Sequence, residues 1–187
     1  MKRVFCITGK AGAGKSTVAK ILKRRGFRII NVDKLAHVIL EENKDIIRKR
    51  FGEGVVANGK ISRKKLGEVV FRNPELFDEL ERIIHPLIKK RLKNILDKLE
   101  GVIFIDVAIP YKLGIKEFCE KIIVIYADQW IIEKRLRNSG WSDEKIQEVM
   151  KRQGKEYMEP DFIIKNNGSL DLLEKQINDF LKEVELC

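Results

Sequence analysis

The stretch GKAGAGKS, residues 9–16, decides the fold that we predict for this chain. Gly9, Gly14, Lys15 and Ser16 satisfy the pattern G-x-x-x-x-G-K-[ST], in which the backbone wraps around a phosphate. Glycine suits such a loop because it adopts the required dihedral angles and lets the backbone approach the anion closely. An apolar run precedes the stretch and a helical pattern follows it, so we favour a phosphate-binding loop over a turn with incidental glycines.

Two side chains of the loop indicate the kind of ligand. The Lys15 ammonium can reach the β- and γ-phosphates of a nucleoside triphosphate, and the Ser16 hydroxyl can ligate Mg²⁺. The sequence therefore predicts that ATP is bound as phosphoryl donor, together with Mg²⁺.

Continuous apolar runs elsewhere in the chain predict a parallel sheet. They do not alternate with polar residues, which indicates strands covered on both faces. The predicted strands are residues 4–8, 28–32, 102–106, 121–126 and 162–165. A helical pattern follows the loop at residues 16–25, and a second one ends the chain. The closing helix carries the apolar residues Leu172, Leu173, Ile177, Phe180, Leu181 and Val184. We expect an α/β fold of three layers, a parallel five-stranded sheet flanked by helices.

Two longer segments interrupt this alternation. Residues 34–100 are too long for a simple crossover, so we expect an inserted helical subdomain. Within it, residues 73–75 (NPE) supply an N-cap, a proline at the first helical position and an early acid. Apolar residues then repeat at three and four positions, which predicts one buried helix face. They are Ile84, Leu87, Ile88, Leu92, Ile95, Leu96 and Leu99. A second insertion, residues 138–160, has its own helix start at residues 142–144.

The composition limits the class of protein. The 187 residues include 38 basic and 28 acidic side chains, and the resulting net charge of +10 favours polyanionic partners such as nucleotides, nucleic acid or anionic membrane. A basic surface that is merely solvated is an equal alternative. Hydrophobic residues make up 44% of the chain, which is enough for a packed core in a single domain of this length.

The use of cysteine and histidine argues against a zinc site. Cys6, Cys119 and Cys187 form no C-x-x-C pair, and only His37 and His85 could join them. Scattered thiols suit a reducing cytosol. The predicted first strand leaves no room for a signal peptide, and no apolar run approaches the roughly 20 residues of a membrane helix. We therefore expect a cytoplasmic protein.

Missing motifs narrow the activity to a small-metabolite kinase. No aspartate has a glycine three residues on, as in the D-x-x-G segment of GTP-binding switches, and the guanine signature N-K-x-D is also missing. Large ATPases generally exceed this length. A kinase must close over its substrates to exclude water. The two insertions are therefore candidates for an acceptor-binding region and a lid.

Two aspartates follow predicted strands at the sheet edge where such folds bind ligands. Asp33 comes after the strand at residues 28–32 and is a candidate for the base, or for the residue that positions the acceptor hydroxyl. Its alternative role is to cap the next helix. Asp106 ends the strand at residues 102–106, where it either holds Mg²⁺ through water or caps the following loop.

Five segments together match a known pattern. VFCITGKAGAGKST contains Thr8 before the loop, and NVDKLAH contains Asp33. Residues 51–74, followed by the His-Pro pair at residues 85–86, form the most specific segment. EKRLRN contains Arg135, and DFIIKNNG provides a final strand and turn. Over most of its length the chain resembles the dephospho-coenzyme A kinases.

The resemblance implies a reaction and a set of site residues. ATP with Mg²⁺ would phosphorylate the ribose 3′-hydroxyl of dephospho-CoA, giving coenzyme A and ADP in the last step of coenzyme A biosynthesis. Asp33 would accept the hydroxyl proton, while Lys15 and Arg135 would stabilise charge on the transferring group. Acceptor contacts would come from Thr8, Asp33, Arg63 and His85, and ATP contacts from Gly12, Ala13, Gly14, Lys15, Ser16 and Thr17. A single domain, residues 1–187, would consist of a core (1–33, 101–137 and 161–187), an acceptor-binding insertion (34–100) and a lid (138–160).

Some roles stay open. His85 is either a hydrogen-bonded structural residue or a substrate contact. Lys112 stands where the family has an acidic residue, and the short lid leaves Arg152 and Lys155 as alternative phosphate contacts. A set of basic residues either attracts the acceptor's phosphates or forms a solvated face. The set comprises Arg48, Lys49, Arg50, Lys60, Lys64 and Lys65.

Two other functions compete with this interpretation. A kinase for nucleoside monophosphates or shikimate-like acceptors is the nearest rival. From another class, a nucleotide-dependent module could bind RNA or protein through its positive charge, although the chain has no aromatic-rich RNA motif. We expect ATP and dephospho-CoA as small-molecule partners, no nucleic acid or membrane partner, and a monomer.

Overall fold

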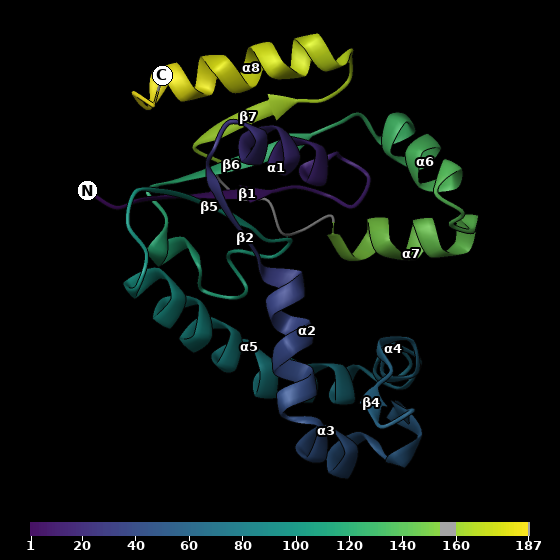
Figure 1. Cartoon of the computed structure of the whole chain (residues 1–187). Helices are drawn as coiled ribbons and strands as arrows, with labels where there is room; N and C mark the ends of the chain where they lie inside the picture. The colour runs from purple at the N-terminus through teal and green to yellow at the C-terminus, as the bar shows by residue number, and fades with distance from the viewer. Residues whose placement is uncertain (154–159, 187) are drawn as a thin grey trace. The chain divides into compact units, whose positions relative to one another are not determined.

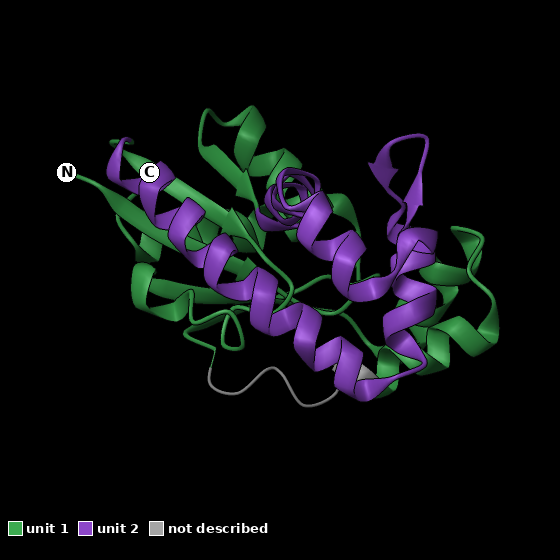
Figure 2. Ribbon diagram, turned by 90° about the horizontal axis from the view of Figure 1, so that it is seen from below, with its two compact units in different colours: residues 1–31, 99–187 green, residues 32–98 purple. Residues whose placement is uncertain are grey.

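The chain divides into two compact units, which Figure 2 shows in different colours. The computed structural model describes residues 1–153 and 160–186. Unit 1 comprises residues 1–31 and 99–187, and unit 2 comprises residues 32–98. Unit 2, residues 32–98, begins and ends two residues before the corresponding bounds of the predicted insertion, residues 34–100. Its role in acceptor binding stays a prediction.

Unit 1 is built on a parallel sheet of five strands in the order β2-β5-β1-β6-β7 (Figure 1). The strands are β1 (Arg3–Thr8), β2 (Arg28–Asn31), β5 (Val102–Asp106), β6 (Lys121–Tyr126) and β7 (Phe162–Lys165). The predicted parallel five-stranded sheet is therefore confirmed. Because β1 lies at the centre, the loop that follows it leaves the middle of the carboxyl edge of the sheet.

Buried aromatic rings hold helices to one face of this sheet. Phe5 of β1 stacks on Phe104 of β5 with ring centroids 5.4 Å apart, and Phe180 meets Phe5 edge-on at 5.7 Å. Phe180 belongs to helix α8 (Leu170–Glu183), and helix α1 (Lys15–Arg24) adds its apolar side chains to the same cluster. Such ring pairs contribute on the order of 1 kcal/mol beyond their buried area. This packing fixes α1 at the end of the phosphate loop.

Helix α8 buries most of the apolar face that the sequence predicts. Five of the six apolar residues are at most 3% exposed, namely Leu173, Ile177, Phe180, Leu181 and Val184. Leu172, in contrast, is 56% exposed. A helix turns through about 100° per residue, so Leu172 lies outside the stripe that begins at Leu173.

The junction between β2 and helix α2 (Val32–Glu42) is tighter than predicted. The strand ends at Asn31, and Val32 is already helical and buried. Asp33 is thus the second residue of α2, within its first turn, and does not take the N-cap position. A carboxylate in the first turn of a helix is favoured by the helix dipole.

Unit 2 is mainly helical, as predicted. Besides α2 it contains α3 (Lys44–Phe51), the short 3-10 turn η1 (Glu53–Val55), α4 (Arg63–Phe71) and α5 (Pro74–Asp97). The predicted cap of α5 is confirmed, because Oδ1 of Asn73 accepts hydrogen bonds from the N–H groups of Glu75 at 2.9 Å and Leu76 at 3.3 Å. The fully buried residues of α5 recur every four positions, at Ile84, Ile88, Leu92 and Leu96.

Unit 2 also contains a small hairpin that was not predicted. Strands β3 (Val56–Ala57) and β4 (Lys60–Ile61) pair antiparallel. Asn58 and Gly59 between them have φ values of 51° and 74°. Two consecutive positive φ angles are typical of the tight hairpin turn that Asn-Gly favours. This dipeptide was the sequence signal for the hairpin, and strands of two residues gave no hydrophobic pattern of their own.

We predict that Gly59→Ala destabilises the protein by about 1–2 kcal/mol through backbone strain alone. A Cβ at Gly59 would meet nothing within 4 Å, so only its left-handed φ opposes the substitution. Gly54→Ala is the matched control, because that position also has open space but lacks a left-handed φ. Urea unfolding followed by circular dichroism compares the two variants, and equal effects would contradict the strain argument.

Candidate active site

The loop between β1 and α1 depends on glycine where it enters the helix. Gly14 has a φ of 104°, in the region that side chains other than glycine rarely adopt. A Cβ built on Gly14 would lie 2.1 Å from Nδ2 of Asn166, well inside contact distance. Glycine is therefore required here both by the backbone angle and by the side chain packed against it.

The first turn of α1 is suited to an anion. The N-cap residue Gly14 provides no side-chain hydrogen bond, and the first turn contains no acidic residue. Lys15 is half-buried and its Nζ donates to the carbonyl oxygen of Gly9 at 2.7 Å, which places the ammonium over the loop. Ser16 is exposed beside it. Backbone N–H groups and the helix dipole both favour a phosphate at such a helix start.

Two side chains from later in unit 1 contact the carbonyl groups of the loop. Asn166 follows β7, is 7% exposed and donates from Nδ2 to the carbonyl oxygen of Ala13 at 2.8 Å. Arg135 of α6 (Gln129–Asn138) lies with Nη1 at 3.4 Å from the carbonyl oxygens of Gly12 and Ala13. Its Nη2 donates to the backbone oxygen of Asn166 at 2.9 Å. The structure thus brings Arg135 to the loop, where it contacts backbone oxygens.

Thr8 and Asp106 lie at the carboxyl ends of neighbouring strands. Thr8 is fully buried, and its Oγ1 donates to the carbonyl oxygen of Ala108 at 3.1 Å. Asp106 is 8% exposed, and its Oδ2 accepts a hydrogen bond from Nδ2 of Asn31 at 2.8 Å. The Thr8 hydroxyl therefore ties β1 to the segment after β5, and its predicted contact with the acceptor stays a prediction. Asp106 is held at the sheet edge by an amide donor.

A cleft of about 330 Å³ opens beside the loop in unit 1. Lys10 and Ala13 of the loop contribute to its lining, as does Met150 of helix α7 (Asp143–Gln153). The remaining lining residues are Val124, Ile125, Tyr126, Ala127, Gln129 and Ile132. Helix α7 therefore reaches a cavity next to the phosphate loop, which is the position that a lid requires.

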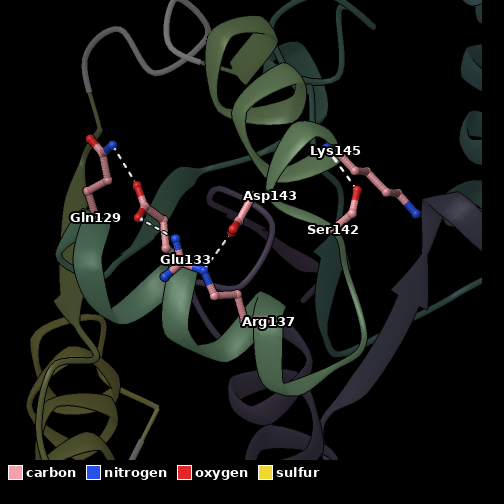
Figure 3. Close-up of polar contacts among 6 residues, drawn as sticks. All are labelled: Gln129, Glu133, Arg137, Ser142, Asp143 and Lys145. Atoms are coloured by element: carbon pink, nitrogen blue, oxygen red, sulfur yellow. Dashed lines mark hydrogen bonds and ion pairs between the residues drawn. The ribbon is translucent and has the colours of Figure 1, made fainter.

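Polar contacts join helices α6 and α7, as Figure 3 shows. Arg137 of α6 lies with Nη2 at 3.4 Å from Oε2 of Glu133, and its Nε donates to Oδ1 of Asp143 at 2.7 Å. Ser142 Oγ accepts from the N–H of Lys145 at 3.4 Å, which agrees with the predicted helix start. The hydrogen bond to Asp143 is the main reason that the pKa of Arg137 is raised. These groups are exposed, so the pairs orient α7 more than they stabilise it.

Three predicted acceptor residues lie in unit 2, namely Arg63 and His85 of the predicted insertion and Asp33, which was predicted at the end of a core segment. Asp33 in the first turn of α2 and Arg63 at the start of α4 are both exposed. His85 is half-buried within α5, and its Nε2 lies 3.8 Å from Oε1 of Glu81 one turn earlier. Asp33 and Arg63 are thus available to solvent, whereas His85 has a carboxylate neighbour on its own helix.

The predicted basic set of unit 2 is partly paired with acids. Arg48 lies 3.4 Å from Glu53, and Arg50 lies 3.4 Å from Glu79. The four lysines of the set are exposed, namely Lys49, Lys60, Lys64 and Lys65. The arginine pairs are typical of a solvated charged face.

Three further predicted positions belong to unit 1. Lys112 is exposed. Arg152 lies in the last turn of α7, where the structure describes its backbone but not its side chain. Lys155 lies outside the described residues. The choice between Arg152 and Lys155 as a phosphate contact therefore stays open.

Other kinds of site were also sought. Within residues 1–153 and 160–186, no three His, Cys, Asp or Glu side chains cluster so that they could hold a metal ion. In the same ranges, no helix combines the length and apolarity needed to cross a bilayer. Cys6 is a buried free thiol. Its pKa is raised, first by a hydrogen bond with Cys119 and then by burial.

Comparison with known proteins identifies the family. A family model described as dephospho-CoA kinase matches residues 3–171. The chain belongs to the dephospho-CoA kinase family. The dephospho-CoA kinase of Helicobacter pylori strain J99 is 35% identical over 192 residues, an alignment that covers 97% of both chains.

Solved structures agree with membership of the dephospho-CoA kinase family. The dephospho-CoA kinase from Campylobacter jejuni superimposes with a TM-score of 0.70 at 30% identity, covering 98% of each chain. A protein of Thermus thermophilus reaches a TM-score of 0.85 at 27% identity, again over 98% of each chain. The match therefore extends over the whole fold, including the insertions.

Sequence reasoning did not identify two residues of this site. Asn166 and Asn31 both follow or end short strands, and both donate side-chain hydrogen bonds to groups at the sheet edge. The segment containing Asn166 was recognised only as a strand and turn. For Asn166 the available signal was a polar amide directly after an apolar strand. Its hydrogen-bond partner, Ala13, lies more than 150 residues away in the sequence.

We predict that Thr8→Val lowers the free energy of unfolding by about 1–3 kcal/mol, because it keeps the shape of the fully buried side chain but leaves the half-buried Ala108 carbonyl without this donor. Thr17→Val is the control, since Thr17 is the only other threonine and is half-buried. Urea denaturation should show the larger loss for Thr8→Val. Equal midpoints would show that the Thr8 hydrogen bond contributes little.

Proposed function

We propose that this protein transfers the γ-phosphoryl group of ATP to the ribose 3′-hydroxyl of dephospho-CoA, giving coenzyme A and ADP in the last step of coenzyme A biosynthesis. The family match over residues 3–171 carries the proposal. It is supported by the geometry of the phosphate loop, where a glycine-rich turn leads into a helix that begins at Lys15.

The donor is bound by residues 12–17. The N–H groups of Gly14, Lys15 and Ser16 face the triphosphate, whereas those of Ala13 and Thr17 donate to the carbonyl oxygens of Lys10 and Gly14. The Lys15 ammonium, which lies over the loop, interacts with the β- and γ-phosphates. The start of α1 contributes its dipole to the same charge. These groups neutralise ATP without any acidic residue in the first helical turn.

Mg²⁺ is the expected cofactor, and the donor set suits it. Ser16 offers an exposed hydroxyl in the first turn of α1, and Asp106 offers a carboxylate at the end of β5. Oxygen ligands of this kind are those that Mg²⁺ prefers, with further ligands from phosphate and water. The ion would supply charge neutralisation on the phosphates of ATP.

The acceptor hydroxyl loses its proton to Asp33. In the reaction the 3′-oxygen forms a bond to the γ-phosphorus, the bond from that phosphorus to the β–γ bridging oxygen breaks, and the proton passes to the Asp33 carboxylate. The exposure of Asp33 and its place in the first turn of α2 support this role. Arg63 and His85 contact the acceptor from the same unit, and Thr8 completes the predicted set.

Positive side chains stabilise the transferring group. Lys15 and Arg135 supply charge where negative charge spreads over the oxygens of the transition state. The half-buried setting of Arg135 supports this role, since a fixed cation costs little reorganisation. The same guanidinium also contacts the loop carbonyls.

Acceptor binding and closure over the nucleotide belong to different segments of the chain. Residues 34–100 bind the acceptor and residues 138–160 close over the nucleotide, using Arg152 or Lys155 as a phosphate contact. The lining of the cleft by Met150 supports the lid assignment. We propose a cytoplasmic monomer that acts on small molecules and has neither nucleic acid nor membrane as a partner.

An acceptor panel tests the proposed activity directly. With ATP and Mg²⁺, dephospho-CoA should release ADP at a rate far above that with shikimate, AMP or adenosine. Mass spectrometry of the product should show one added phosphoryl group on the ribose. ADP formation with another acceptor, and only background formation with dephospho-CoA, would overturn the assignment.

We predict that Asp33→Asn reduces kcat by a factor on the order of 10² or more while ATP binding is retained, because the amide cannot accept the hydroxyl proton. Asp45→Asn is the matched control, since Asp45 is also an exposed aspartate in the first turn of a helix. Steady-state kinetics and calorimetric ATP titration provide the measurements. Turnover close to that of the unmodified protein would remove Asp33 from the role of base.

A further inference from the structure

Three polar groups of Asn166 contact three different parts of unit 1. Its Nδ2 donates to the carbonyl oxygen of Ala13 in the phosphate loop at 2.8 Å. Its backbone N–H donates to the carbonyl oxygen of Tyr126 at the end of β6 at 2.7 Å. Its backbone oxygen accepts from Nη2 of Arg135 at 2.9 Å. Asn166 therefore connects the loop, the sheet edge and α6 from the turn between β7 and α8 (Figure 1).

The hydrogen bond from Asn166 to Ala13 supplies a donor to a carbonyl oxygen of the loop. In a trans peptide group the N–H and the carbonyl of the preceding residue point in opposite directions, so a Gly14 N–H that faces a phosphate directs the Ala13 carbonyl into the protein. Ala13 is fully buried, so its carbonyl oxygen has little access to water and needs a protein donor. The Asn166 amide is the shortest such contact, because Nη1 of Arg135 lies at 3.4 Å from the same oxygen.

We propose that Asn166 is a positioning residue for the phosphoryl donor, and that its amide holds the Ala13 carbonyl outward so that the N–H of Gly14, on the opposite side of the same peptide group, faces the triphosphate. The inference rests on the proposed binding of ATP by this loop. Asn166 does not touch the reacting atoms in this account. It acts through the backbone of residues 12–14.

The neighbouring Gly14 supports the inference independently. The space that a Cβ on Gly14 would occupy is taken by the Asn166 amide, 2.1 Å away. The amide nitrogen thus lies against two consecutive loop residues, hydrogen-bonded to one and in steric contact with the other. A loop with a side chain at residue 14 could not adopt the same position against Asn166.

Asn167 provides a matched control within the same turn. Its Oδ1 accepts a hydrogen bond from the backbone N–H of Asp128 at 2.9 Å, which is similar in length to the contact of Asn166. Asn167 is exposed and its printed partner lies outside the phosphate loop. Loss of either side chain removes one hydrogen bond to the backbone, but only the loss at Asn166 changes the loop.

The test measures ATP affinity by calorimetric titration of the full chain in the absence of acceptor. We expect Asn166→Ala to weaken ATP binding roughly tenfold, as for a buried carbonyl that loses its donor. Asn167→Ala should leave the affinity unchanged. Asn166→Asp keeps the size of the side chain but places an acceptor against the Ala13 oxygen, so it should weaken binding at least as much even if the alanine variant is poorly folded.

Kinetics separate positioning from a merely structural role. The KM for ATP should rise in Asn166→Ala and Asn166→Asp, while the KM for dephospho-CoA stays within about twofold of its original value. A lower melting temperature with unchanged ATP affinity and unchanged KM for ATP would overturn the inference, because Asn166 would then stabilise the fold alone.

A double-mutant cycle with Gly14→Ala gives a second criterion. The strain of a left-handed alanine is present in both backgrounds and cancels, whereas the clash with the amide exists only when Asn166 is present. Gly14→Ala should therefore weaken ATP binding several-fold less in the Asn166→Ala background. Additive effects would contradict direct packing of the amide on the loop.

These outcomes are distinguishable from failure of the proposed function. If dephospho-CoA is not the acceptor, the ATP titrations of the Asn166 and Asn167 variants still differ as expected. If Asn166 has no positioning role, dephospho-CoA is still phosphorylated and all variants bind ATP equally.

Discussion

The direction of the backbone groups between β1 and α1 is the constraint on which the site depends. A phosphate is bound by N–H groups that face it. In each trans peptide group the carbonyl of the preceding residue points the opposite way, into the protein. One such carbonyl, on the fully buried Ala13, accepts a hydrogen bond from Asn166. The phosphate loop is therefore completed by a turn that lies more than 150 residues further along the chain.

The order of strands explains why such distant segments meet. β1 is central, with β5 and β6 on its two sides and β7 next to β6. All five strands are parallel, so Thr8, Asp106 and Asn166 lie at or just beyond the same carboxyl edge. In the register of the sheet, Asp106 of β5 pairs with Ile7 of β1 on one side and with Asn31 of β2 on the other. The pairing of the strands thus fixes the relative positions of the polar groups at the edge of the sheet.

Unit 2 has a core of its own, formed around its longest helix. Its longest helix, α5, buries residues at intervals of four, and α2 and α4 pack against it. The Asn73 cap and Pro74 define where α5 begins, and the Asn58-Gly59 turn allows two short strands to pair before α4. These local signals are strong because each depends on residues adjacent in the chain. Asp33 and Arg63 of this unit lie in the first turns of α2 and α4, where both side chains are exposed.

The sequence by itself determined the features that depend on neighbouring residues. The loop at residues 9–16 defined the strand, turn and helix around it, apolar runs gave the strands with bounds within one or two residues, and NPE at residues 73–75 gave the start of α5. Membership of the dephospho-CoA kinase family was also visible as a resemblance in several motifs and agrees with the family match. Tertiary structure alone decided the burial of Thr8, the exposure of Leu172, and the contacts of Asn166 and Arg135 with the loop. These depend on which side chain from a distant segment reaches a given carbonyl or core position, and that is set by three-dimensional packing, which the local order of residues does not specify.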